Sequence, residues 1–148
     1  MNMNKQTSHD ETLLSEVYKS VTMGVDSIST LIQKTTDTTL RSDLSTQLEE
    51  YQKFATAAKT KMYEKNFKVK ESSIFAKIPA EVSMNVTAMM DNSNTKIAEM
   101  MITGSTAGVI GLTRTIRQTP DASPDCTQLA NDVVTFEENS INKMKTYL

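Results

Sequence analysis

A helical repeat of apolar residues constrains this chain more than any other feature of its sequence. In the first quarter of the chain, apolar side chains recur every three or four residues, the spacing that places them on one face of an α-helix. These residues are Leu14, Tyr18, Val21, Val25, Ile28 and Ile32. The same spacing returns in three later segments. Four such stripes bury one another most simply in an all-α four-helix bundle.

Local signals give the expected bounds of the first two helices. Ser8 and Glu11 have the spacing of a capping box, which predicts a first helix over about 9–34. The apolar repeat then stops at a short polar break around Asp37, whose side chain favours a turn. The repeat resumes beyond the break, so we expect a second helix over about 38–65.

The third and fourth helices are expected over about 79–118 and 124–147. Pro79 marks the start of the third helix. Ser123 is a suitable N-cap for the fourth, and Pro124 suits its first helical position. The whole chain then forms a single four-helix-bundle domain.

The lengths of the connections predict an antiparallel bundle with a ferritin-like crossover. The connections before the second and fourth helices are short, whereas the connector 66–78 contains 13 residues. Fully extended, such a connector spans roughly 43–47 Å, enough to cross a bundle of ~39 Å helices. An alternative stays open, in which a helix begins at Ser72 or Ser73 and kinks at Pro79.

Composition argues against most catalytic chemistry. One His, one Cys and no Trp leave too few residues for a His-based triad or a structural zinc site. A net charge of −2 argues against nucleic acid or anionic lipid as the main partner. We therefore expect no enzyme activity, no catalytic residues, no cofactor and no resident metal. We also expect no secretory signal and no membrane span, and hence a cytoplasmic protein.

Two acidic doublets stand where di-metal four-helix bundles carry Glu-x-x-His ligands. They begin at Glu49 and Glu137, but Gln52 and Ser140 occupy the positions where histidine is needed. Neutral Gln or Ser binds iron or manganese far more weakly than imidazole, so we expect these carboxylates to be solvated or to lie at the boundary of the core. The alternative is a degenerate metal-binding or oxidative site formed by Glu49, Glu99 and Glu137.

The third helix carries features that predict association. Gly104, Gly108 and Gly111 share one face, and we expect the backbone of a neighbouring helix to pack closely against them. Adjacent methionines at 89–90 and 100–101 widen the apolar face beyond what one bundle core requires. We therefore expect a homodimer formed through this helix, although another protein partner is also compatible.

Other residues could take part in catalysis or binding, but we expect structural roles for them. His9 is expected to be exposed and without function, and Cys126 to be a small residue at a helix start rather than a reactive thiol. A basic cluster is expected to form a solvated face rather than a nucleic-acid site. It contains Lys59, Lys61, Lys65, Lys68 and Lys70, interleaved with Tyr63 and Phe67.

Several segments carry a resemblance to a known group of proteins. They are Leu40-Arg41-Ser42-Asp43-Leu44, Gln47-Leu48-Glu49-Glu50-Tyr51, Lys61-Met62-Tyr63-Glu64-Lys65, Ile97-Ala98-Glu99-Met100-Met101 and Phe136-Glu137-Glu138. The chain resembles ferritin-like four-helix bundles of spore-forming Firmicutes, including the spore coat F-like proteins. The resemblance implies a structural or interaction role linked to sporulation, with no catalytic residues because the Glu-x-x-His positions are unmatched.

Overall fold

The computed structural model describes residues 3–69 and 90–148, and these residues form four α-helices without a β-strand. The helices are α1 (Met3–Lys34), α2 (Thr38–Glu64), α5 (Asn94–Gln118) and α6 (Pro124–Lys145). The all-α, four-helix class predicted from the apolar repeats is therefore confirmed. Among the described helices, none has the length and apolarity needed to cross a membrane.

Helix α1 begins earlier than the capping box predicts. It starts at Met3, so Ser8 lies within the helix and does not cap it. No Gly or Pro interrupts the residues between Met3 and Ser8, and an existing helix extends cheaply through such residues once it has nucleated. The predicted start at residue 9 is wrong. Of the additional helical residues 3–8, Gln6 is half-buried and the others are exposed.

Helix α2 has the ends that its sequence predicts. The Asp37 side chain accepts a hydrogen bond from the Leu40 amide at 2.8 Å, which caps the first turn. The helix ends before Asn66, whose φ of 61° is left-handed. The Phe67 amide then donates to the Met62 carbonyl at 2.8 Å, the bond of a Schellman motif.

Helix α5 starts later than predicted. The expected helix over 79–118 is interrupted, because Met90 to Ser93 are not helical and α5 begins at Asn94. The Ser93 side chain accepts a hydrogen bond from the Lys96 amide at 3.2 Å and so provides the N-cap. The expected start at Pro79, the kink there and the path of the crossover lie outside the described residues.

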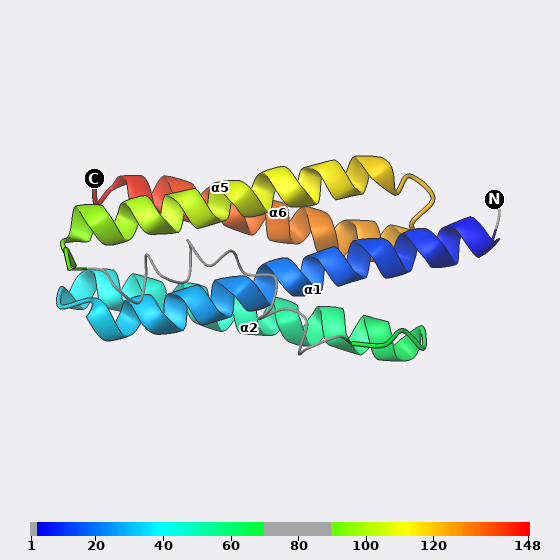
Figure 1. Ribbon diagram of the computed structural model, residues 1–148, viewed down its shortest axis with the longest axis horizontal. Coiled ribbons are helices and arrows are strands. Elements are labelled where there is room, and N and C mark those ends of the chain that lie inside the picture. Colours follow the sequence, from blue (N-terminus) through cyan, green and yellow to red (C-terminus); the bar gives the residue numbers. More distant parts are fainter. Residues whose placement is uncertain (1–2, 70–89) are drawn as a thin grey trace.

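The two ends of the bundle are joined by different contacts (Figure 1). At one end, Asp10 of α1 pairs with Lys65, just after α2, and accepts a hydrogen bond from the amide of Ser123, the N-cap of α6. At the other end, the Asn92 side chain donates to the Lys34 carbonyl at 2.9 Å. There the Tyr147 hydroxyl also donates to the Asp43 carboxylate. The described ends of the chain lie at opposite ends of the molecule.

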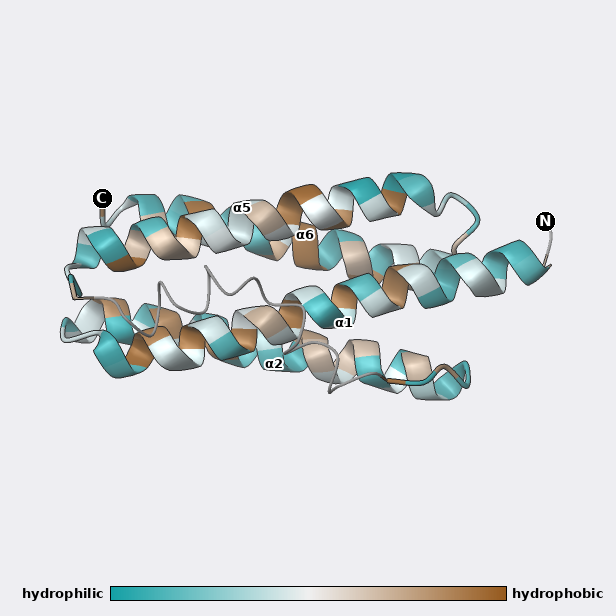
Figure 2. Cartoon of the chain, in the orientation of Figure 1, coloured by the Kyte–Doolittle hydropathy of each residue, from teal (hydrophilic) through white to brown (hydrophobic). Residues whose placement is uncertain are grey.

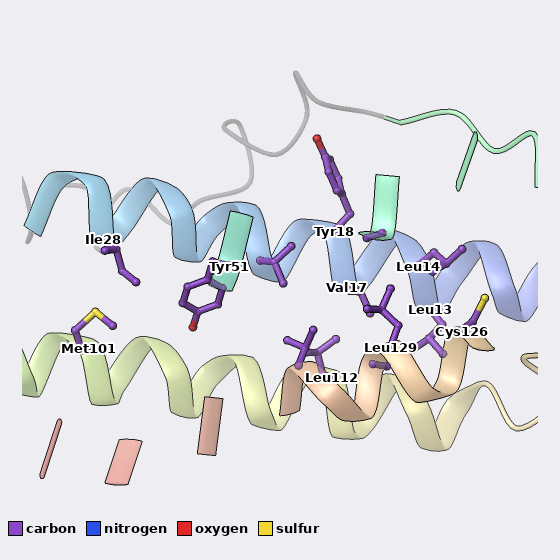
Figure 3. Packing of buried hydrophobic residues seen from close by; sticks show 14 of the residues in the cluster. Leu13, Leu14, Val17, Tyr18, Ile28, Tyr51, Met101, Leu112, Cys126 and Leu129 are labelled. Carbon is purple, nitrogen blue, oxygen red and sulfur yellow. The ribbon is translucent and has the colours of Figure 1, made fainter. Parts of the chain in front are cut away.

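The core lies between the helix pairs α1–α2 and α5–α6. Apolar residues recur along each ribbon between polar ones (Figure 2), as the sequence repeats predict. In Figure 3, Val17, Leu112 and Leu129 project into one space, and Ile28 faces Met101. Fully buried large side chains come from all four helices: Leu13, Leu14, Val17, Ile28, Leu31, Leu40, Leu44, Met62, Ile97, Leu112, Glu137 and Met144. Glu137 is the only ionisable residue in this set.

Candidate functional site

A polar layer crosses the middle of the apolar core. We call it the Glu137 layer, and its members come from every described helix: Ser20 of α1, Tyr51 of α2, Ser105 and Gly108 of α5, and Glu137 of α6. A layer of this kind is unusual because a buried carboxyl group is stable only with hydrogen bonds or an opposite charge.

Glu137 has few of the partners that a buried carboxylate requires. It is 1% exposed. Its Oε1 atom accepts one long hydrogen bond from the Ser20 hydroxyl at 3.4 Å, and Oε2 has no partner among the described residues. Burial disfavours the charged form and raises the pKa of Glu137 to about 8, although the bond from Ser20 acts in the opposite direction. The group is therefore mostly uncharged at neutral pH.

Gly108 makes room for the Glu137 carboxyl group. A Cβ atom at position 108 would lie 2.0 Å from Glu137 Oε2, which no side chain could tolerate without movement. The predicted packing of a helix backbone against the glycine face is therefore wrong at Gly108. At Gly111 a Cβ atom would meet the Glu16 carboxylate at 3.5 Å, an ordinary contact, and at Gly104 it would meet nothing within 4 Å.

Tyr51 closes the layer from α2. Its hydroxyl shares a hydrogen bond with the side chain of Ser105, and its pKa is raised, first by burial and then by the charge of Glu137. The ring meets Phe136 edge to face, with 4.8 Å between centroids. On its other side a Cβ atom at Gly24 would lie 2.7 Å from the ring, so this glycine allows α1 and α2 to approach closely.

Ser140, which stands where a Glu-x-x-His motif starting at Glu137 would have histidine, is also buried and has a hydrogen-bond partner. The Ser140 hydroxyl donates to the Gln47 side-chain carbonyl at 2.6 Å, joining α6 to α2. Both side chains are buried. Ser140 is therefore engaged in holding two helices together.

The three carboxylates of the alternative metal hypothesis are not brought together. Glu49 and Glu99 are exposed, whereas Glu137 is buried. The expectation that the acidic doublets are solvated or lie at the core boundary is thus wrong for Glu137, which is 1% exposed and follows Val133 by one helical turn on the buried face of α6. Within residues 3–69 and 90–148, no three His, Cys, Asp or Glu side chains are grouped as metal ligands. The described residues do not fit a di-metal centre.

A second buried carboxylate lies at the end of the bundle, in what we call the Asp10 cluster: Asp10, Lys65, Ser123, Asp125 and Cys126. Asp10 is 4% exposed. It accepts hydrogen bonds from the Ser123 amide at 2.6 Å and from the Ser123 hydroxyl at 2.9 Å. The Lys65 ammonium lies 3.5 Å from its other oxygen. One side chain therefore ties α1 to the end of α2 and to the first turn of α6.

The cysteine and the histidine are both part of this end of the bundle. Cys126 is fully buried, and burial raises the pKa of its thiol to about 11, so it is a poor nucleophile. His9 is half-buried, and its Nδ1 atom accepts a hydrogen bond from the Asp121 amide at 3.0 Å. The expectation that His9 is exposed is wrong, because the side chain is half-buried and satisfies a loop amide.

The basic cluster is partly neutralised. Lys61 lies 3.2 Å from the Asp125 carboxylate, and Lys65 pairs with Asp10. Phe67 is buried and so cannot stack on a nucleic-acid base. Lys70 lies outside the described residues.

The outward face of α5 carries a shallow open hollow. Within it, Ile110 is 52% exposed, one of the few large apolar side chains of the described residues that is open to solvent. The hollow is lined by Val109, Ile110, Thr113, Arg114, Arg117 and Gln118. The methionines contribute less than expected: Met101 is buried, and Met90 is 96% exposed but precedes the helix. Met89 lies outside the described residues.

Sequence reasoning missed Asp10 and the burial of Glu137, although a signal for both was present. Asp10 precedes Leu14 and Val17 by four and seven residues, and Glu137 follows Val133 by four. Each acid thus stands on the apolar stripe of its own helix.

No protein-family model matches this chain, and comparison with curated proteins and with solved structures gives no significant match.

Proposed function

We propose that this protein is a non-catalytic, antiparallel, ferritin-like four-helix bundle that works by associating with a second copy of itself. The contacts at the two ends support this architecture. Lys65, just after α2, lies beside Asp10 at one end, whereas Asn92, just before α5, lies beside Lys34 at the other. α2 therefore ends and α5 begins at opposite ends of the bundle, as a crossover connection requires.

The observation that carries the proposed association is the half-exposed Ile110 in the hollow on α5. An apolar side chain held open beside two arginines, Arg114 and Arg117, has the composition of a protein contact, since arginine and large apolar residues are enriched there. Methionines add little to this face, so the proposed contact differs from the Met-rich one expected from sequence.

The α5 face is complementary to itself. Gly104, Ala107, Ile110 and Arg114 follow one another at helical spacing, and the first two leave room for a partner. An antiparallel pairing of two α5 helices centred on Ala107 places Ile110 of each copy against Gly104 of the other, where a Cβ atom would meet nothing within 4 Å. The same pairing brings the Glu99 end of each helix to the Arg114 end of the other. The interface is therefore isologous, as twofold dimers require.

Light scattering tests the association. At micromolar concentration we expect a mass of twice 16.5 kDa. Ile110→Asp should give a monomer, because it places a carboxylate in the apolar centre of the contact. Tyr63→Ser is the matched control, since Tyr63 is similarly exposed but lies on α2. A monomeric wild-type protein, or a dimer that survives Ile110→Asp, would contradict the proposal.

Metal analysis separates the proposed role from the oxidative alternative. Protein produced in medium rich in iron and manganese should carry well under one equivalent of transition metal. Stoichiometric metal that is lost in Glu137→Ala but kept in Glu138→Ala, a change of an exposed neighbour, would favour the alternative instead.

The resemblance to bundle proteins of spore formers adds a proposal about when and where the protein acts. We propose a cytoplasmic protein that becomes associated with the spore. Immunoblots across growth and sporulation test this: expression confined to sporulation supports the link, and equal amounts in growing cells oppose it.

A further inference from the structure

The Glu137 carboxyl group is enclosed by neutral and acidic groups from every described helix. α1 presents the Ser20 hydroxyl, and a turn away the Glu16 carboxylate lies beside Gly111. α2 presents the Tyr51 phenol, α5 presents Ser105 and Gly108, and the next residue of α6 is the exposed Glu138. In the described part of the chain, no ion pair includes Glu137.

In the position that it occupies, the Glu137 carboxyl group is closed off from water, since the side chain is 1% exposed. Oε2 lies in the notch that Gly108 provides, 2.0 Å from where a Cβ atom would stand. The amides of the central turns of α5 and α6 are used in their own helical hydrogen bonds. A negative charge on Oε2 can be hydrated only if α5 and α6 separate at this layer or if the side chain swings out past Ser20.

We propose that Glu137 is a proton-operated latch, which lets the four helices close around an uncharged carboxyl group and loosens the contact of α6 with α1 and α5 when the proton leaves to solvent. The device is a regulated opening of the bundle. It does not depend on association between two copies, because the Glu137 layer is internal to one chain.

The direction of the effect follows from proton linkage. The pKa of Glu137 is raised from 4.5 to about 8, so the folded chain holds this proton more tightly than the unfolded chain. The contribution of Glu137 to stability is therefore greatest below about pH 4.5, falls as pH rises from about 4.5 to about 8, and levels off above that range. Within that window this one group lowers the folding equilibrium constant by up to about tenfold for each pH unit.

Urea unfolding from pH 5 to pH 9 tests the latch, followed by far-ultraviolet circular dichroism on chelator-treated protein. Glu137→Gln keeps the shape of the side chain and cannot titrate, and Glu138→Gln is the exposed control. We expect the folding constant of the wild type and of Glu138→Gln to fall with pH relative to Glu137→Gln, by at least tenfold between pH 6 and pH 8. Parallel pH profiles for all three proteins would overturn the proposal.

A second measurement needs no variant. In wild-type protein labelled with ¹³C at the glutamate carboxyl carbons, one resonance should titrate near pH 8, accompanied by a change in near-ultraviolet circular dichroism from the tyrosines, since the chain has no Trp. If every glutamate titrates near its ordinary pH, the latch does not exist. Neither result depends on the mass found by light scattering, so failure of the latch and failure of self-association are distinguishable.

Discussion

Among the residues that the structure describes, two carboxyl groups are buried, and their surroundings differ. Asp10 lies where helices begin and end, and it receives the Ser123 amide, the Ser123 hydroxyl and Lys65. Glu137 lies at mid-helix and receives one long bond from Ser20. The difference follows from backbone chemistry, because the first turn of a helix has free amides and the central turns have none. A buried acid at a helix end can be an anchor, whereas one at mid-helix depends on side chains alone.

The largest expected effect comes from removing the anchor. Asp10→Ala should lower the free energy of unfolding by about 3 kcal/mol, because it leaves the Ser123 amide and hydroxyl without their acceptor and Lys65 without its partner. Asp10→Asn keeps an acceptor oxygen and should lose less. Urea unfolding at pH 7 measures both. A loss below about 1 kcal/mol for Asp10→Ala would show that the two buried acids are not as different as their contacts indicate.

The opposite sign is expected at Glu137. Glu137→Met should raise the free energy of unfolding by about 1–4 kcal/mol at pH 8, because an apolar side chain of similar volume needs no partner. The gain should shrink at pH 5, where the wild-type carboxyl group keeps its proton, since the pKa of Glu137 is raised to about 8. Glu138→Met, at the exposed neighbouring position, controls for a general effect of methionine. Destabilisation by Glu137→Met at both pH values would indicate that the carboxyl group has partners beyond Ser20.

The notch at Gly108 allows a sharper test. Gly108→Ala should destabilise the bundle by about 1–3 kcal/mol, because its methyl group would displace the Glu137 carboxyl. Gly111→Ala, one turn away, meets Glu16 at an ordinary distance and should stabilise α5 by up to about 1 kcal/mol. Combining Gly108→Ala with Glu137→Ala should recover part of the loss, a coupling that a double-mutant cycle measures. Additive losses would show that the glycine and the carboxyl group do not share the space.

The fold was predictable where the sequence combines an apolar stripe with a clear cap. Asp37 and Pro124 mark the starts of α2 and α6, and the stripe residues Leu14 and Val133 are fully buried. The prediction failed where one signal overrode another. Apolar residues near Met90 predict a longer third helix, but Ser93 has an extended backbone and caps α5, which begins at Asn94.

The candidate sites were less predictable, because they depend on how helices are set against one another. The position of Glu137 on its stripe could have indicated burial. That it would face Gly108 on one helix and Ser20 on another depends on the axial register of three helices. Local sequence patterns do not encode this register, since it is fixed by packing across the whole core. That Ser123 and Lys65 would donate to Asp10 could not be predicted for the same reason, since they come from other parts of the chain.

The smallest effect is expected at Asp125, which shares Lys65 with Asp10 but is not buried. A hydrogen bond from Ser123 and the charges of Lys61 and Lys65 lower the pKa of Asp125 to about 2, yet its side chain is 47% exposed. Asp125→Ala should therefore change the free energy of unfolding by less than about 1 kcal/mol, and less still in high salt.

The pH dependence of the Asp125 contribution has the opposite sign to that of Glu137. Because its pKa is lowered from 3.8 to about 2, the contribution is complete above about pH 4 and disappears as pH falls towards 2. Unfolding measured at low and high salt checks both statements. If Asp125→Ala proved as damaging as Asp10→Ala, the lysines alone would account for the stability of this end. The hydrogen bonds that the amide and hydroxyl of Ser123 donate to Asp10 would then not be what distinguishes an anchoring acid from one with few partners.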